Sequence, residues 1–99
     1  MTPEKREATE RVIREIDLYE GDVIVKGEHP LWLAVVDLEK LSRPNERMGR
    51  DGWYSMLDKP AASVWYQGLH ASRAQRPAVA KERFARLREI LLSFVAVNP

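Results

Sequence analysis

The segment from residue 77 to residue 95 has the most regular pattern in the chain, and it predicts a long amphipathic helix. Its apolar side chains recur at steps of four, three, four and three residues: Ala80, Phe84, Leu87, Leu91 and Phe94. That spacing places them along one face of a helix, and such a face has to be buried against other elements. The pattern therefore favours a bundle of helices over an isolated one.

The first residues predict a second helix, from residue 3 to about residue 20. Thr2 is a suitable N-cap, and Pro3 fits the first helical position, where a backbone N–H is not needed. Gly21 is a natural end. The first two turns are so polar that we expect them to project into solvent or to reach a partner.

The next stretch allows two interpretations. Residues 22–26 are short and β-branched and predict a strand or an extended segment. Residues 31–38 would then be a second strand of a hairpin, or else a helix that begins at Pro30 and is ended by Pro44. We favour the helix, because its apolar residues keep helical spacing and because a lone two-stranded hairpin is marginally stable.

Residues 51–75 predict two helices separated by a break. The first is short and ends at Leu57, and Lys59-Pro60 restarts the chain into a second helix that runs to about Gln75. Gly68 costs the second helix about 1 kcal/mol relative to alanine, so we expect another backbone to pass close to it. The sequence thus predicts a mainly α fold of four to five helices in a small bundle. At most one short β-hairpin or extended segment lies near residues 22–36, and residues 1–99 form a single domain.

The composition is that of an ordinary globular protein, with 44% apolar and 31% charged residues and no cysteine. The lack of cysteine excludes disulfides and thiolate chemistry and is compatible with a reducing compartment. The longest purely apolar run, residues 31–36, is far too short for a membrane span. The charged N-terminal residues do not resemble a secretory signal. We expect a soluble, cytoplasmic protein with no membrane partner.

Catalytic and metal-binding patterns are weak in this sequence. His29 and His70 stand far apart, and neither belongs to a ligand pair with metal-binding spacing. The fold could bring Ser55, His70 and Asp58 together as a catalytic triad, but nothing in their spacing along the sequence favours one. We therefore expect no metal, no cofactor and no enzyme activity.

A repeated Trp-Tyr-x-x-Leu motif, at residues 53–57 and 65–69, predicts the functional surface. One small core can hardly bury this much ring surface, so part of it should be offered to another protein. Trp, Tyr and Arg are also the residues that most often dominate protein interfaces. The predicted partner-binding residues are Arg43, Arg47, Arg50, Trp53, Tyr54, Trp65, Tyr66, Leu69 and Arg73.

The last helix also predicts a homodimer, because apolar side chains lie on more than one of its sides. The predicted dimer seam consists of Phe84, Leu87, Leu91, Leu92 and Phe94. Together these features favour a small non-enzymatic regulator, an inhibitor or antiactivator that binds another protein.

Nucleic-acid binding is the alternative. Residues 1–42 hold six Lys/Arg against ten Asp/Glu, whereas residues 43–99 hold ten against five. The basic half could therefore contact phosphates. A Gly-x-x-Gly pattern at residues 49–52 and a helix-turn-helix with its turn at Arg76-Pro77 would be the means of binding.

Overall fold

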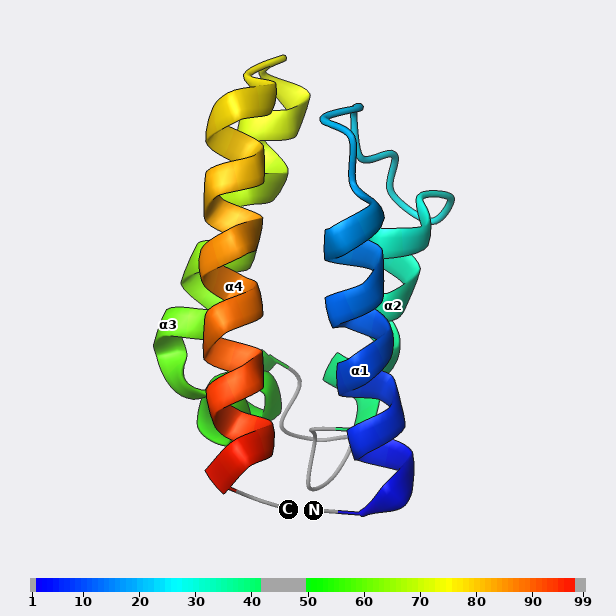
Figure 1. Ribbon diagram of the computed structural model, residues 1–99, viewed down its shortest axis with the longest axis vertical. Helices are drawn as coiled ribbons and strands as arrows, with labels where there is room; N and C mark the ends of the chain where they lie inside the picture. Colours follow the sequence, from blue (N-terminus) through cyan, green and yellow to red (C-terminus); the bar gives the residue numbers. More distant parts are fainter. Residues whose placement is uncertain (1, 42–49, 98–99) are drawn as a thin grey trace.

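Four α-helices make up the part of the chain that the structure describes, a computed structural model covering residues 2–41 and 50–97, with side chains for residues 2–41 and 61–97. They are α1 (Pro3–Leu18), α2 (Pro30–Leu41), α3 (Arg50–Arg73) and α4 (Pro77–Val97). Successive helices run in opposite directions, so that both ends of the chain lie at the same end of the molecule (Figure 1). α1 packs mainly against α2 and α4, and α4 packs mainly against α3. The mainly α bundle predicted from the sequence is confirmed.

The segment around residues 22–36 contains no strand, since residues 2–41 form only helices, turns and irregular backbone. The preferred helix from Pro30 is confirmed as α2. The loop before it is nevertheless anchored, because Ile24 is buried and its backbone N–H donates to Ser72 Oγ at 3.3 Å. Ser72 Oγ in turn donates to the backbone oxygen of Leu69 at 2.8 Å. One buried serine therefore joins the first loop to the end of α3.

Side chains cap the first two helices. Thr2 Oγ1 accepts from the backbone N–H of Lys5 at 3.2 Å, which confirms Thr2 as the N-cap of α1. At α2, His29 Nδ1 accepts from the backbone N–H of Leu31 at 3.1 Å, while Nε2 lies 2.8 Å from an Asp22 carboxylate oxygen. Because Nδ1 accepts, the ring proton sits on Nε2 and is donated to Asp22. His29 thus serves as a helix cap.

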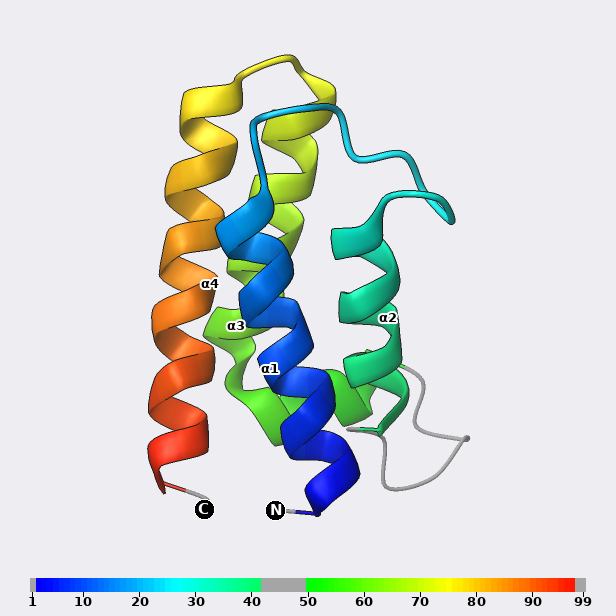
Figure 2. The same ribbon diagram turned by 45° about the vertical axis from the view of Figure 1, so that its right-hand side comes forward.

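The predicted break at Lys59-Pro60 is wrong, because α3 is one helix from Arg50 to Arg73. Proline inside a helix removes one backbone hydrogen bond and bends the chain without having to end the helix. The ribbon of α3 bends in its first half (Figure 2). Directly after Pro60, Ala61 and Ala62 are fully buried, so tertiary packing holds this stretch in the helix.

Three rings in the core join the C-cap of α1 to α3 and α4. Phe84 is fully buried, and its ring lies 5.0 Å from that of Tyr19 and 5.5 Å from that of Trp65, measured between centroids. The close approach at Gly68 comes from this same ring and not from a backbone, as the sequence had suggested. A Cβ added to Gly68 would lie 2.4 Å from Phe84 Cε1, so glycine makes room for the ring.

The polar first turns of α1 do not project into solvent as a whole, contrary to the prediction. Lys5 is only 6% exposed and Thr9 is fully buried. The Thr9 hydroxyl donates to the backbone oxygen of Lys5 at 2.8 Å, and Lys5 Nζ lies 5.4 Å from the centre of the Phe94 ring. Burial lowers the pKa of Lys5 below its ordinary value. Hydrogen bonding within the helix and the aliphatic stem of lysine make this burial possible.

Candidate functional site

A groove opens between α2 and α3. Its volume of about 540 Å³ is within the usual range of ligand-binding pockets. We refer to it as the α2–α3 groove. It is lined by Lys26, Trp32, Val36, Glu39, Trp65, Tyr66, Leu69, His70 and Arg73.

Helical periodicity places these side chains on facing sides of the two helices. Trp32, Val36 and Glu39 are spaced by four and three residues, so they share one face of α2. On α3, the lining residues fall at positions 65–66, 69–70 and 73, which also share a face. The helices run in opposite directions, so the start of α2 lies opposite the end of α3 (Figure 2).

The apolar part of the groove has a fixed inner wall and a more accessible rim. Trp65 and Leu69 form the inner wall, because they are only 4% and 6% exposed. Trp65 is held there by its contact with the Phe84 ring. Trp32 and Tyr66 are partly buried and pack against the core from outside, which leaves part of each ring accessible.

The polar residues of the groove are distributed unevenly along it. Lys26, in the loop before α2, and Arg73, in the last turn of α3, are both exposed, and both of these elements lie at the same end of the bundle. His70 is also exposed, one turn before Arg73. Glu39 lies on α2, two turns after Trp32, and is partly buried. Positive charge is therefore concentrated at one end of the groove.

The predicted partner-binding residues are only partly brought together here. Trp65, Tyr66, Leu69 and Arg73 line the groove, although Trp65 and Leu69 are only 4% and 6% exposed. The remaining five lie outside the described residues or in the part of α3 whose side chains are not described: Arg43, Arg47, Arg50, Trp53 and Tyr54.

Sequence reasoning missed the α2 side of the groove. Trp32, Val36 and Glu39 were not among the predicted partner-binding residues, and neither were Lys26 and His70. The four-and-three spacing on α2 was a visible signal for a shared face. Nothing local, however, indicated that this face would stand opposite Tyr66 and Arg73.

The described tryptophans have different environments. Trp65 is enclosed in the core, which corrects its assignment to an exposed surface. The physical reason is its contact with the fully buried Phe84 ring, 5.5 Å away between centroids. Trp32 is partly buried at the groove rim. Among the residues with described side chains, the expectation that some ring surface stays outside the core therefore rests on Trp32, Tyr66 and Phe94.

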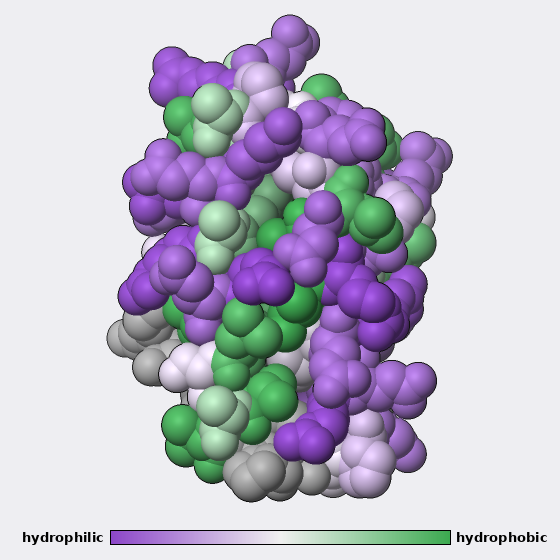
Figure 3. Space-filling view, in the orientation of Figure 1, coloured by the Kyte–Doolittle hydropathy of each residue, from purple (hydrophilic) through white to green (hydrophobic). Residues whose placement is uncertain are grey.

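The predicted dimer seam is wrong for three of its five residues. Phe84, Leu87 and Leu91 are fully buried within a single chain, where they pack in the bundle core. They are thus unavailable to a second chain. Leu92 is 41% exposed, and Phe94 is partly buried. Apolar residues do gather at the surface over the C-terminal part of α4 and along its seam with α1 (Figure 3).

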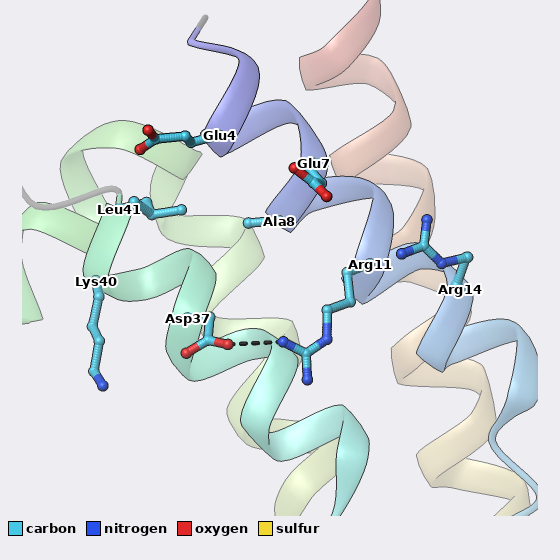
Figure 4. A pocket seen from close by; sticks show the side chains of 8 residues that line it. All are labelled: Glu4, Glu7, Ala8, Arg11, Arg14, Asp37, Lys40 and Leu41. Atoms are coloured by element: carbon cyan, nitrogen blue, oxygen red, sulfur yellow. Dashed lines mark hydrogen bonds and ion pairs between the residues drawn. The ribbon is translucent and has the colours of Figure 1, made fainter.

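A second hollow, of about 430 Å³, lies between α1 and α2. Figure 4 shows Arg11 of α1 reaching across it to Asp37 of α2, and these side chains form an ion pair at 2.8 Å. The rest of its lining mixes both signs of charge with two apolar residues: Glu4, Glu7, Ala8, Arg14, Lys40 and Leu41. The described lining of this hollow includes no aromatic ring, so it is a weaker candidate for a partner than the α2–α3 groove.

Among the described side chains, Ser72 and His70 do not form a nucleophile–base pair. Ser72 lies close to His70 in sequence but is buried and bonded to the backbone, whereas His70 is exposed. Ser55 and Asp58 fall in the part of α3 without described side chains. Within the described chain, no three His, Asp or Glu side chains converge as metal ligands.

The nucleic-acid motifs considered from the sequence do not have the required geometry. α3 and α4 lie antiparallel and side by side (Figure 1), whereas the two helices of a helix-turn-helix cross at a steep angle. Of the Gly-x-x-Gly pattern, Gly49 lies outside the described residues. Arg50, Asp51 and Gly52 belong to α3 and are therefore helical, not a clamping loop.

Comparisons with protein-family models, with curated proteins and with solved structures found no match to this chain. In the described residues, no helix combines the length and the apolar character needed to cross a membrane.

Proposed function

We propose that this protein is a small non-enzymatic regulator that acts in the cytoplasm by binding another protein, as an inhibitor or antiactivator does. The α2–α3 groove would be the binding surface. The observation that carries the proposal is the gathering of Trp32, Tyr66 and Arg73 around one hollow. Residues of these three types supply most of the binding energy at protein interfaces.

The way the groove is built supports a binding role. Its inner wall is fixed, because Trp65 and Leu69 are buried in the core. Its rim, formed by Trp32 and Tyr66, keeps ring surface that a partner could cover. A rigid wall reduces the ordering cost of association, and rings bury much area with few rotatable bonds.

We also propose that the protein forms a homodimer, through the last turns of α4 and not through the core face of that helix. Leu92 is 41% exposed and Val97 is 74% exposed. Figure 3 shows apolar surface over the C-terminal part of α4. A second copy would cover this region while leaving the α2–α3 groove, on other helices, open.

The binding proposal is tested with a matched pair of substitutions on α2. Trp32→Ala removes ring surface from the groove, whereas Leu33→Ala removes an exposed apolar side chain of the same helix that does not line it. The wild type and both variants are used in affinity capture from the native host, followed by mass spectrometry. Circular dichroism establishes that each variant is folded.

We expect the wild type and Leu33→Ala to retain the same specific partner and folded Trp32→Ala to lose it. If folded Trp32→Ala retains the partner as well as Leu33→Ala does, the groove is not the binding surface. Trp65→Ala is unsuitable for this test, because truncating a buried tryptophan costs about 3–5 kcal/mol of stability.

A further inference from the structure

Two cations stand at one end of the α2–α3 groove, and neither is neutralised by a described side chain, whereas three of the eight arginines with described side chains are. Arg11, Arg86 and Arg88 each form an ion pair, at 2.8, 3.0 and 2.8 Å, with Asp37, Glu89 and Asp17 respectively. Lys26 and Arg73 form no ion pair or hydrogen bond through their side chains with any residue whose side chain is described. They also line the same hollow.

Two such cations beside an apolar wall select for negative charge in a partner. An approaching segment that covers Trp32 and Leu69 also removes water from around Lys26 and Arg73. That loss of hydration is unfavourable unless the segment supplies carboxylates. A segment with a lysine or arginine at this end would meet like charge, which disfavours wrong partners.

From this arrangement we propose that the α2–α3 groove binds a short acidic segment of a partner protein. An apolar side chain of that segment packs against Trp32 and Tyr66, and its carboxylates lie at Lys26 and Arg73. The segment is short because the α2 wall extends only from Trp32 to Glu39, about 10 Å at the helical rise of 1.5 Å per residue. This inference rests on the proposed function and adds the chemistry of the partner.

A peptide fits these features better than a single-stranded nucleic acid does. Nucleic-acid grooves follow the backbone with a series of positive charges and expose flat rings for bases to stack on. Here the cations stand at one end only, Glu39 lines the α2 wall further along, and Trp65 is buried with little of its face available. The aliphatic side chains of Val36 and Leu69 suit an apolar anchor.

The test begins with selection from a library of randomised short peptides displayed on phage, with the wild-type protein as bait. Peptides whose binding Trp32→Ala weakens and Leu33→Ala does not are assigned to the groove. Their net charge is then compared with that of the unselected library. We expect acidic residues to be enriched beside an aromatic or aliphatic residue.

Charge reversal supplies the second measurement, by fluorescence anisotropy with one selected peptide. Lys26→Glu combined with Arg73→Glu should weaken binding about tenfold or more, since each substitution replaces attraction by repulsion. The control is Arg14→Glu combined with Lys81→Glu, which changes the net charge equally at exposed positions on α1 and α4. We expect the control to weaken binding much less.

The outcomes separate this inference from the proposed function. If groove-dependent peptides are selected but are neutral or basic, or if both charge-reversed proteins bind equally, the acidic partner is refuted and the binding groove stands. If no selected peptide depends on Trp32, the groove itself fails as a peptide-binding site. If single-stranded oligothymidylate binds and displaces the peptides, and the double reversal abolishes that binding, the groove is a nucleic-acid site and the inference is overturned.

Discussion

Replacing Gly68 by alanine tests directly whether the Phe84 ring packs against Gly68 in the core. Alanine is the better helix former, and at an ordinary helical position the change stabilises a protein by about 1 kcal/mol. Here the new Cβ would lie 2.4 Å from Phe84 Cε1 and 2.8 Å from Cδ1. Carbon atoms in contact prefer about 3.5–4.0 Å, so the ring would have to move by more than about 1 Å.

The Phe84 ring has little room for that movement. It is fully buried, and the rings of Tyr19 and Trp65 lie 5.0 and 5.5 Å away. Overpacking of this kind costs about 1–3 kcal/mol or more, which exceeds the gain in helix propensity. We expect Gly68→Ala to lower the free energy of unfolding by about 1–2 kcal/mol and the Tm by about 5–15 °C.

Urea unfolding followed by circular dichroism measures the change, and a double-mutant cycle assigns its cause. In a Phe84→Leu background the ring atoms are gone, so Gly68→Ala should become neutral or stabilising. A stabilisation of about 1 kcal/mol by Gly68→Ala in the wild-type protein would refute the reasoning. Equal destabilisation in both backgrounds would refute the assignment to Phe84.

Three further predictions concern the first loop and the surface. Burial and the nearby Asp22 carboxylate raise the pKa of Tyr19 above its ordinary value, and its hydroxyl donates to the backbone oxygen of Asp22 at 2.7 Å. The folded protein therefore keeps the phenol proton at a pH where the unfolded chain loses it. The free energy of unfolding of the wild type, relative to that of Tyr19→Phe, should be constant below about pH 9 and fall above about pH 10. A relative free energy of unfolding that rises above about pH 10 contradicts the assignment. His29→Ala should lower the free energy of unfolding in urea by about 1 kcal/mol, because the cap of α2 is lost. His29→Asn should lower it much less, because asparagine is a good N-cap. Equal decreases in the two variants would mean that the cap contributes little to stability. Leu92→Glu should convert a homodimer into a monomer in light scattering after gel filtration, and a wild type that is already monomeric at high concentration would disprove the dimer.

The sequence by itself indicated most of the helical residues and where three of the helices begin, although it left residues 31–38 open and divided α3 at Pro60. Thr2 and two prolines, Pro30 and Pro77, stand where α1, α2 and α4 start, and the periodicity of α4 identified its buried face. These signals are local, since capping and spacing involve residues within one or two turns of each other. They could therefore be read without knowing how the helices pack.

Only the tertiary structure decided how those helices pack together and which side chains are buried, exposed or paired. It carried α3 through Pro60, enclosed Trp65 against Phe84 and left Trp32 at a groove rim. It also brought Lys26 and Arg73, which are far apart in the sequence, into the lining of one groove. Burial and charge pairing depend on which faces of distant segments come into contact, and no pattern within one segment contains that information.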